Sequence, residues 1–505
     1  MDRLDRLLDH ITMYRLLLYF LLVLVGSAML LGALGRLPYS PMAIAAEAGY
    51  LVVACWLINR VFAHVYQAPH NPESSLLTAL ILALIITPPA SLQSFVFLSA
   101  AAGLAMASKY ILAIRRQHIF NPAAIAVVLT SLGAGQSASW WVGTSQLAPI
   151  VIIGGILIAR KVQRGTMIAV FLATASVMTV LLASMHGGHA IISTLQSTVL
   201  HSSLLFLGFV MLTEPLTSPS TRHKQIWYAL VVGLLFSPQI HLLHTYSTPE
   251  IALVIGNLFA YALTRRVRLL PRLQQKVAWG PSVHDFIFAP GRKFDYRPGQ
   301  YMEWTLPHDS PDNRGVRRYF TLASSPTEDN LRIGVKFYEK GSSFKTALWS
   351  IRRSTPIAAG LLGGDFTLPD DKTRKLAFIA GGIGITPYRS MLKYLVDTDD
   401  KRDITLLYSE RSVADLAYHD VFKDARQRLA TKVVYTISDQ VAALPQGIRK
   451  GQITPALIQT EVPDYRERLF YISGPQPMVA AIRSGLHSLG VAEHDIKTDF
   501  FPGYA

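Results

Sequence analysis

The amino-acid sequence predicts two halves of different fold class. The first half is expected to be a polytopic all-α membrane domain, and the second an antiparallel β-barrel followed by an α/β doubly wound domain. The chain has 505 residues, which is too long for a single core. Up to about residue 265 it consists of long apolar runs with few charges, whereas beyond this point charges are frequent and apolar runs are short. We therefore expect domains at residues 1–268, 275–370 and 371–505.

The charge and cysteine content exclude several classes of function. The net charge is +15, but many Lys and Arg residues stand at the ends of apolar runs, where membrane topology explains them. Because no basic stripe is interleaved with aromatic residues, we expect no nucleic-acid partner. Cys55 is the only cysteine. An intramolecular disulfide, a zinc–thiolate site and a Cys-ligated iron–sulfur cluster are therefore excluded within one chain, and no metal site is predicted.

Apolar runs in the first half indicate about ten spans by the criterion of roughly 20 residues, and some of these runs are short. The first of these runs is too long for a usual signal peptide, so we expect it to be retained. Lys and Arg gather in alternate loops from Arg60 to Arg268, while the other loops carry almost none apart from Arg36. The positive-inside rule then places both termini, and with them the second half, in the cytoplasm of a multi-pass cell-membrane protein. The runs are centred near Leu22, Ala48, Leu82, Ala101, Val127, Ile153, Ala173, Leu207, Val232 and Ile255.

Three polar stretches interrupt these apolar runs. Asn-Pro and Glu-Pro at helix entrances free backbone groups, which a membrane tolerates where they line a cavity or meet protein. Such entrances could hold a flavin or an ion, and Glu214 favours a functional interpretation. The alternative is that Asn121 merely caps a span and that the third stretch is an ordinary polar loop. The stretches are Thr78–Leu84 running into Thr87-Pro88-Pro89, His118–Ala124, and Thr213–Thr221.

In their order and spacing, these blocks resemble the family of membrane subunits that is shared by the sodium-pumping NADH:quinone oxidoreductase and the Rnf electron-transport complex. The resemblance covers roughly residues 10–265. It implies a flavin in the membrane domain, commonly FMN linked through phosphate to a threonine in a Ser-Gly-Ala-Thr motif. This chain departs from that motif, and its nearest analogue is Val142-Gly143-Thr144-Ser145. FMN or riboflavin at Thr144 is therefore a hypothesis, and a turn after the interfacial pair Trp140 and Trp141 is the alternative.

Haem is a weaker hypothesis for the membrane half. A bis-histidine haem needs paired histidines on facing helices at similar depth. The sequence offers no two convincing pairs within the runs. The histidines considered are His64, His118, His201 and His241.

After Arg272 the pattern changes to short β-rich runs punctuated by Gly and Pro, which predicts a small antiparallel barrel. From Lys375 onward strands alternate with helices, which predicts a parallel doubly wound sheet. The barrel strands are expected at Val283–Ala289, Tyr301–Leu306, Tyr319–Ala323 and Leu331–Phe337. The later strands are expected at Leu376–Ile379, Ile404–Tyr408, Val433–Ile437 and Leu469–Ser473, with helices from Pro387, near Ala414–Leu429, near Thr454 and at Pro475–Leu489.

A barrel followed by such a sheet resembles the ferredoxin–NADP reductase family over about residues 275–505. The resemblance implies that FAD and NAD(P)H are cofactors. In the family's first flavin motif, Arg holds the flavin pyrophosphate, an aromatic ring packs on the flavin, and a hydroxyl faces flavin N5. A guanidinium matches two phosphate oxygens, and a short hydroxyl can bond to N5 without blocking hydride approach. The matching residues here are Arg318, Tyr319, Phe320 and Thr321, with Thr321 as a candidate catalytic residue.

The second flavin motif and the nucleotide motifs are also present. A glycine and a helix N-terminus favour phosphate at Gly341, Ser342 and Ser343. A glycine-rich turn after an apolar strand allows close approach of a nicotinamide nucleotide at Gly381, Gly382 and Gly384, with Thr386 as its polar group. The family's Cys-Gly-Pro-x-x-Met turn is matched by Ser473, Gly474, Pro475 and Met478, with Ser473 as a candidate catalytic residue in place of Cys. An aromatic terminus that covers the flavin is matched by Phe500, Phe501 and Tyr504.

Nucleotide selectivity is expected after the second strand of the sheet. Glu410 would repel a 2′-phosphate and accept from a 2′-hydroxyl, whereas Arg411 could meet the phosphate. We favour NADH over NADPH on this basis.

The expected function is a membrane-bound, FAD-dependent NAD(P)H oxidoreductase. Hydride would pass to FAD, and single electrons would pass to a membrane flavin, a quinone, a redox protein or an extracytoplasmic acceptor. The expected partners are thus the lipid bilayer, NAD(P)H and that acceptor. One alternative is a transporter or ion channel coupled to or regulated by the reductase domain, although acidic groups within the runs are few, chiefly Glu47 and Glu214. Another is that the membrane half only anchors the enzyme, but ten spans are far more than an anchor needs.

Overall fold

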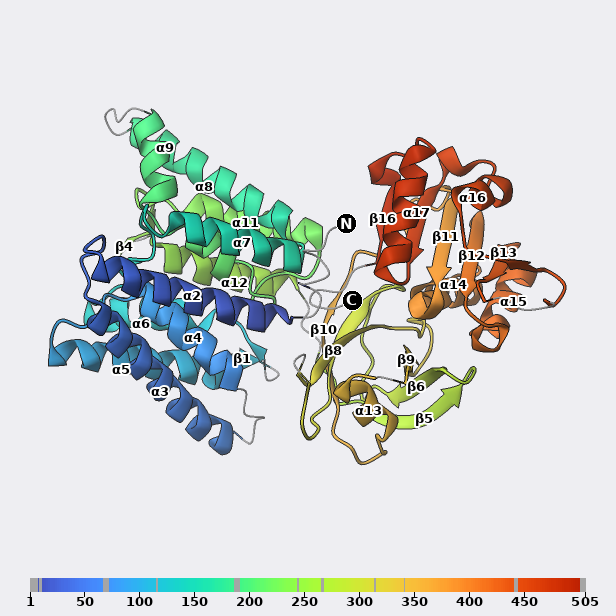
Figure 1. Ribbon diagram of the computed structural model, residues 1–505, viewed down its shortest axis with the longest axis horizontal. Coiled ribbons are helices and arrows are strands. Elements are labelled where there is room, and N and C mark those ends of the chain that lie inside the picture. Colours follow the sequence, from blue (N-terminus) through green and yellow to red (C-terminus); the bar gives the residue numbers. More distant parts are fainter. Residues whose placement is uncertain are drawn as a thin grey trace. The chain divides into compact units, whose positions relative to one another are not determined.

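The computed structural model describes residues 8, 11–66, 72–114, 117–185, 191–242, 245–264, 268–312, 315–339, 341–439 and 444–499. The chain forms two compact units with the boundary between Arg265 and Arg266. We call Leu7–Arg265 the N-terminal unit and the unit containing Arg266–Ala505 the C-terminal unit. Figure 1 shows helices throughout the first and mixed strands and helices in the second.

The N-terminal unit is built from helices packed side by side around one apolar core. Two short hairpins, β1–β2 (Ala113–Ile114, Gln117–His118) and β3–β4 (His241–Leu242, Thr245–Tyr246), connect some of them. Each of the residues on which a predicted apolar run is centred, from Leu22 to Ile255, lies in a helix. The helices are α2 (Met13–Ala33), α3 (Pro41–Val65), α4 (Pro72–Ile85), α5 (Leu92–Ile111), α6 (Pro122–Ala134), α7 (Ala148–Val162), α8 (Gly165–Met185), α9 (Ile191–Leu200), α10 (Leu204–Phe206) with the π-helix Leu207–Met211, α11 (Arg222–Leu235) and α12 (Pro249–Leu263).

Helix length separates these elements into two classes. By length and composition, α2, α3, α5 and α8 could each cross a membrane, and α9 with Leu204–Met211 could form a fifth span bent by 56°. By contrast, α4, α6 and α12 are apolar but have 14, 13 and 15 residues, respectively. At 1.5 Å per residue, such helices fall short of a hydrocarbon core of about 30 Å. Among the described residues, ten full spans are therefore not found, and the number of crossings and their orientation stay predictions.

Several of these helices begin with a capping side chain followed by proline. Ser40, Asn121 and Thr248 each accept a hydrogen bond from the backbone N–H three residues ahead, at 3.2, 3.1 and 3.4 Å. Proline at the next position lacks only an N–H that would have no partner in the helix. Asn121 therefore caps α6, as one of its two interpretations predicted. Its side-chain amide also donates to Glu214.

The first part of the C-terminal unit is a pair of three-stranded antiparallel sheets around an apolar core. One sheet has the order β10-β7-β8 and the other β5-β6-β9. β6 matches its predicted range, whereas β5 and β10 were not predicted. Because β5 begins at Arg272, it starts ahead of the expected domain boundary at residue 275. The elements are β5 (Arg272–Ala278), β6 (Val283–Ala289), β7 (Tyr301–Thr305), β8 (Arg317–Thr321), β9 (Leu331–Lys336), helix α13 (Ser343–Trp349) and β10 (Ala358–Gly363).

The second part is a six-stranded parallel sheet with the order β14-β13-β12-β11-β15-β16. Helices α14 and α15 pack on one face, and α16 and α17 on the other, so apolar side chains cover both faces. This is the doubly wound arrangement that the alternating pattern predicted. The elements are β11 (Leu376–Gly381), α14 (Thr386–Thr398), β12 (Ile404–Glu410), α15 (His419–Leu429), β13 (Lys432–Ile437), β14 (Ile448–Lys450), α16 (Pro455–Glu461), β15 (Leu469–Ser473), α17 (Gln476–Ser488) and β16 (Ile496–Thr498).

Candidate functional site

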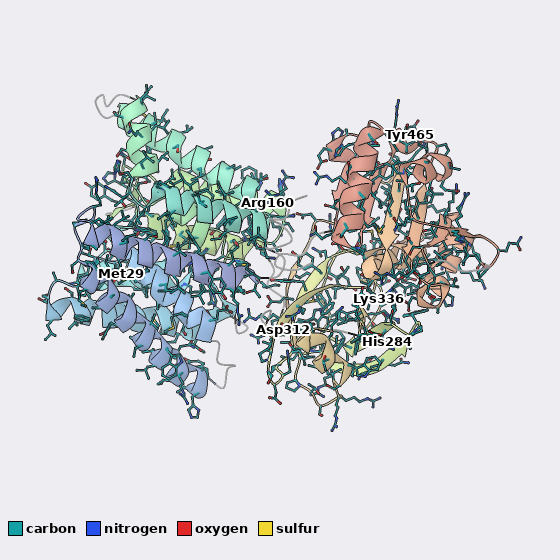
Figure 2. All side chains as sticks on the ribbon, viewed as in Figure 1. Met29, Arg160, His284, Asp312, Lys336 and Tyr465 are labelled. Carbon is teal, nitrogen blue, oxygen red and sulfur yellow. The ribbon has the colours of Figure 1, made fainter. Side chains whose placement is uncertain are left out.

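An anion-binding group of donors lies between β8 and the start of α13. The Arg318 guanidinium is buried and donates from Nη2 to both carboxylate oxygens of Asp312, at 2.9 and 3.2 Å. The backbone N–H of Ser343 donates to the same carboxylate at 3.2 Å. Asp312, labelled in Figure 2, thus stands where these donors converge. Because a phosphate accepts hydrogen bonds from the same donors, the arrangement fits one phosphate of a dinucleotide.

Successive side chains of a strand point to opposite faces, so the residues of the first flavin motif lie on both faces of β8. On one face, Arg318 lies over the ring of Phe344, 5.3 Å from its centroid, and Phe320 lies 5.8 Å from the same ring. On the other face, Thr321 is buried and pairs in register with Tyr301 of β7. Arg318 and Phe320 are therefore brought together with α13, while Thr321 lies opposite to them. The hydroxyl of Tyr319, also on the second face, donates to Glu303 at 2.9 Å.

The start of α13 matches the second flavin motif only in part. Ser342 is the helix cap and accepts from the Lys345 N–H at 3.3 Å, while Ser343 is the first helical residue. The Ser343 hydroxyl accepts from the Asp312 N–H at 2.9 Å. Gly341 has no steric need to be glycine here, since an added Cβ would lie 3.7 Å from the Tyr338 carbonyl oxygen. Its predicted role in phosphate approach stays a prediction.

The glycine-rich turn and the Ser473–Met478 turn meet at the carboxyl ends of neighbouring strands β11 and β15. A Cβ on Gly381 would lie 2.1 Å from the Met478 sulfur, and one on Gly384 would lie 2.4 Å from the Ser473 carbonyl oxygen. Gly382 has a positive φ of 57°. Such close backbone approach is possible only without side chains. The two predicted nucleotide motifs therefore form one continuous edge, with Gly474 against Gly381 and with Pro475 near it.

Ser473 and Thr386 use their hydroxyls locally. The Ser473 hydroxyl is buried and donates to Asp499 at 3.0 Å, and the Asp499 N–H donates to the Ile472 carbonyl at 3.0 Å. The Thr386 hydroxyl donates to the Ile383 carbonyl at 3.1 Å. Asp499 was not predicted as a site residue, although the sequence places it directly before the aromatic terminus. Phe500, Phe501 and Tyr504 lie outside the described residues.

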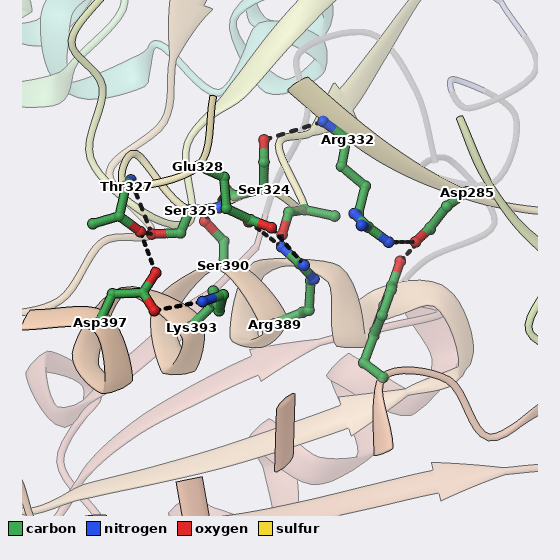
Figure 3. Close-up of polar contacts among 12 residues, drawn as sticks. Asp285, Ser324, Ser325, Thr327, Glu328, Arg332, Arg389, Ser390, Lys393 and Asp397 are labelled. Carbon is green, nitrogen blue, oxygen red and sulfur yellow. Dashed lines mark hydrogen bonds and ion pairs between the residues drawn. The ribbon is translucent and has the colours of Figure 1, made fainter. Parts of the chain in front are cut away.

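A polar network that the sequence did not predict joins the barrel to the sheet (Figure 3). Arg389 of α14 donates to Glu328 of the barrel through both terminal nitrogens, with a distance of 2.8 Å to Oε1, and to the Ala323 carbonyl at 2.8 Å. Burial alone would raise the pKa of Glu328, but the hydrogen bonds and charge of Arg389 outweigh it and hold that pKa below its ordinary value. The Tyr418 hydroxyl donates to Asp285 at 2.6 Å.

Glu410 ends β12, the second strand of the sheet, as predicted. It is buried, and its Oε2 accepts from the ammonium of Lys336 on β9 at 2.7 Å. Lys336 also lies 3.2 Å from Asp415. An acidic residue that ends a buried strand needs a cationic partner, and the barrel supplies one. Glu410 therefore joins the two parts of the C-terminal unit, and the preference for NADH stays a prediction.

In the N-terminal unit, two of the three polar stretches meet at Glu214. The Asn121 amide donates to Glu214 at 2.9 Å, and the Thr217 hydroxyl does so at 3.1 Å. His118 Nε2 lies 3.4 Å from the same carboxylate. Asn257 of α12 accepts from the Asn121 backbone N–H at 2.8 Å. Glu214 thus has hydrogen-bond partners from two of the polar stretches, which explains its presence in an apolar unit through packing.

The candidate flavin attachment residue borders a small pocket. Thr144 and Gly143 line it together with residues of α7 and the α9–α10 bend. The Thr144 hydroxyl is buried and has no hydrogen-bond partner among the described residues. The attachment of a flavin at Thr144 stays a prediction. Trp140 and Trp141 are both buried and donate to Glu250 and to the Ala83 carbonyl, so they form no exposed interfacial pair.

The described residues contain no candidate metal centre. Within the described ranges, no three His, Cys, Asp or Glu side chains are grouped as metal ligands.

Comparison with known proteins places the C-terminal unit among NAD-binding oxidoreductases. Residues 378–484 match the family described as the oxidoreductase NAD-binding domain. A flavohemoprotein of Oceanobacillus iheyensis is 26% identical over 236 residues, covering 45% of this chain and 57% of the relative. The glycine betaine monooxygenase reductase subunit of Chromohalobacter salexigens is 26% identical over 227 residues, covering 44% and 60%. The flavohem-like FAD/NAD-binding domain of a Vibrio cholerae nitric oxide dioxygenase gives a TM-score of 0.41 at 21% identity, covering 46% of this chain and 98% of that one.

The chain spans less than two thirds of the length of both curated relatives. Their similarity is confined to under half of this chain, a length that corresponds to the C-terminal unit. This unit is a ferredoxin-reductase-like oxidoreductase that uses FAD and NAD(P)H.

Proposed function

We propose that the whole protein is a membrane-bound NAD(P)H oxidoreductase that passes reducing equivalents from its C-terminal unit to an acceptor at or beyond the membrane. The observation that carries the proposal is the continuous edge formed by the glycine-rich turn and the Ser473–Met478 turn. Doubly wound sheets bind nucleotides outside the carboxyl ends of their strands, and this edge lies there. The helices of the N-terminal unit that are long enough to span a bilayer support the membrane location.

Each part of this site has an assigned task in the proposal. Arg318 and the N–H of Ser343 hold the FAD pyrophosphate in place of the Asp312 carboxylate. Thr321 would hold the flavin ring, and the backbone from Gly381 to Thr386 would accommodate the nicotinamide nucleotide. The side chain of Ser473, held by Asp499, borders the nicotinamide. When bound, FAD supplies hydride acceptance from NAD(P)H and one-electron donation.

The acceptor side of the proposal rests on Thr144 and on the polar stretches of the N-terminal unit. The buried hydroxyl of Thr144 has no partner among the described residues and borders a pocket, which supports a phosphate-linked FMN there. A quinone or a redox protein is the alternative acceptor. The resemblance of the polar stretches to membrane subunits of quinone-reducing complexes supports an acceptor within the bilayer. Two of these stretches are joined by hydrogen bonds to Glu214, which come from Asn121 and Thr217.

The test is the flavin content of full-length protein and of two matched variants. Arg318→Ala should lose FAD and NADH oxidation with an artificial acceptor, while the neighbouring Arg317→Ala, whose side chain pairs with Glu303, should keep both. Acid extraction and chromatography measure the flavins, and fluorescence of the denatured protein detects covalent flavin. Retention of FAD and activity in Arg318→Ala would refute the flavin site. Thr144→Val should lose only the covalently bound flavin. Absence of covalently bound flavin from the wild-type protein would refute attachment at Thr144.

A further inference from the structure

One acidic side chain of the N-terminal unit differs from the others in its surroundings. Four acidic residues lie in the described part of this unit, and three of them have a partner. Glu47 is fully buried, and neither of its carboxylate oxygens has a hydrogen-bond partner among the described residues. The partners of the others are Arg15 for Glu73 at 3.9 Å, Asn121 for Glu214 at 2.9 Å, and Trp140 for Glu250 at 2.8 Å.

The position of Glu47 makes an isolated negative charge very unfavourable. It lies on α3, an apolar helix of 25 residues with a mean hydropathy of 1.7 over its most apolar window. Glu47 is seven positions after the cap Ser40, which is about 10 Å along the helix axis. A carboxylate without partners at this depth would carry the full cost of desolvation. The side chain must therefore hold a proton or meet a cation.

The neighbouring side chains on the same face of α3 are neutral. Leu51, Cys55 and Asn59 follow Glu47 at intervals of four residues and are all buried. Cys55 is a free thiol, and Asn59 accepts from the Tyr110 hydroxyl at 2.9 Å. A stripe of this kind offers hydrogen-bonding atoms but no positive charge. It provides no set of oxygen ligands for a metal ion among the described residues.

The cationic groups on the helices around Glu47 are engaged elsewhere. Helices α2, α4 and α5 pack against α3. Lys109 of α5 donates to the Ser74 carbonyl at 2.9 Å, and Arg15 of α2 pairs with Glu73 of α4. The other titratable groups on these helices and on α3 are Tyr14, Tyr19, Tyr50, Cys55, Arg60, His64 and Tyr110, and none of them bonds to Glu47.

We propose that Glu47 is a proton-binding site inside the N-terminal unit, which carries its proton at neutral pH and releases it only when a hydrogen-bonding or cationic partner reaches it. Intramembrane carboxyl groups of this kind commonly mark proton relays. A releasable proton at this depth can compensate charge when an electron enters a nearby carrier. This consequence rests on the proposed function, whereas the proton site itself does not.

Infrared spectroscopy of oxidised full-length protein in nanodiscs, without nucleotide, tests the site. At pH 7, where exposed carboxyl groups are ionised, wild type should show a C=O stretch of a protonated carboxyl that is missing in Glu47→Gln. The matched variant Glu73→Gln should keep this band, because Glu73 is partly exposed and pairs with Arg15. An identical band in wild type and Glu47→Gln would overturn the proposal. Because no NADH is added, the result is independent of the reductase activity.

A second variant and a salt series complete the test. Glu47→Met should also fold and lose the band, since an apolar side chain can replace a neutral acid. If Glu47→Met did not fold while Glu47→Gln did, residue 47 would need a polar contact. That result would overturn the assignment of Glu47 as a proton-binding site. Replacing potassium by sodium chloride should leave the wild-type band unchanged. Loss of the band in sodium alone would identify a cation site instead of a proton site.

Discussion

Buried and half-buried carboxylates in the two units have different kinds of partner. In the C-terminal unit, guanidinium groups pair with them, as Arg389 does with Glu328 and Arg332 with Asp285 at 2.7 Å. In the N-terminal unit, Glu214 is held by an amide, a hydroxyl and an imidazole. Burying a second full charge is costly, so neutral donors are the cheaper solution in apolar surroundings. The Arg389–Glu328 pair joins the sheet part to the barrel. Arg332 and Asp285 both lie in the barrel, and the sheet part reaches this pair through the Tyr418 hydroxyl.

Removal of Arg389 should have the largest effect, because it leaves Glu328 without its guanidinium. We expect Arg389→Ala to lower the free energy of unfolding by about 3 kcal/mol, as for other buried ion pairs that lose one partner. Calorimetry of the full-length protein measures this change. Lys393→Ala is the control, since Lys393 forms a partly exposed ion pair with Asp397 within α14 and should cost less than about 0.5 kcal/mol. Equal losses in the two variants would contradict the proposed importance of the Arg389 pair.

Two glycines of the nucleotide turn should differ when replaced by alanine. In Gly384→Ala the new Cβ meets the backbone of Ser473 and Gly474, so the two turns must separate. We expect KM for NADH to rise at least about tenfold, which corresponds to about 1.4 kcal/mol. Gly382→Ala meets only the Glu410 carboxylate at 3.7 Å and costs backbone strain of about 1 kcal/mol. Steady-state kinetics with an artificial acceptor give KM for NADH in both variants. A larger rise of KM in Gly382→Ala than in Gly384→Ala would be inconsistent with this geometry.

Asn121 tests the network of neutral donors in the N-terminal unit. Asn121→Ala removes the cap of α6 and one donor to Glu214, so we expect a loss of about 2 kcal/mol in stability. Ser40→Ala removes only a cap, that of α3, and should cost about 1 kcal/mol or less. Thermal unfolding in detergent compares the variants. If Asn121→Ala were no worse than Ser40→Ala, its bond to Glu214 would contribute nothing to stability.

The pH dependence of the Glu328 pair should give the smallest effect. Since the pKa of Glu328 is lower in the folded protein than its ordinary value of 4.5, its contribution is fully present above this pH and is lost as the pH falls through the folded pKa. The stability difference between wild type and Glu328→Gln should therefore shrink between about pH 5 and pH 3, by less than about 1 kcal/mol because the carboxylate is partly exposed. Urea unfolding at each pH measures the difference. A constant difference would mean that the pKa is not lowered.

Local patterns predicted many elements because their cause is local. β6 is rich in Val, Ile and Phe and is apolar enough to be recognised at its observed bounds, and the runs centred from Leu22 to Ile255 are all helical. β5 was missed because it is mostly polar, with only Leu273 fully buried, as an edge strand can be. Some of the apolar runs were expected to be short, and α4, α6 and α12 have 14, 13 and 15 residues, respectively. The motif residues of the nucleotide edge were found because glycine spacing reflects backbone contact directly.

The sequence by itself determined local features such as the Ser40-Pro41 cap, where α3 begins, and the close turn at Gly384. It also determined the membrane-like composition of one half and the nucleotide-binding character of the other. Only the tertiary structure decided which buried carboxylates have partners. Asn121 and Glu214 are 93 positions apart, and Glu328 and Arg389 are 61 apart. Periodicity relates residues within a few positions, so partners at such separations, and the absence of a described one for Glu47, follow only from packing.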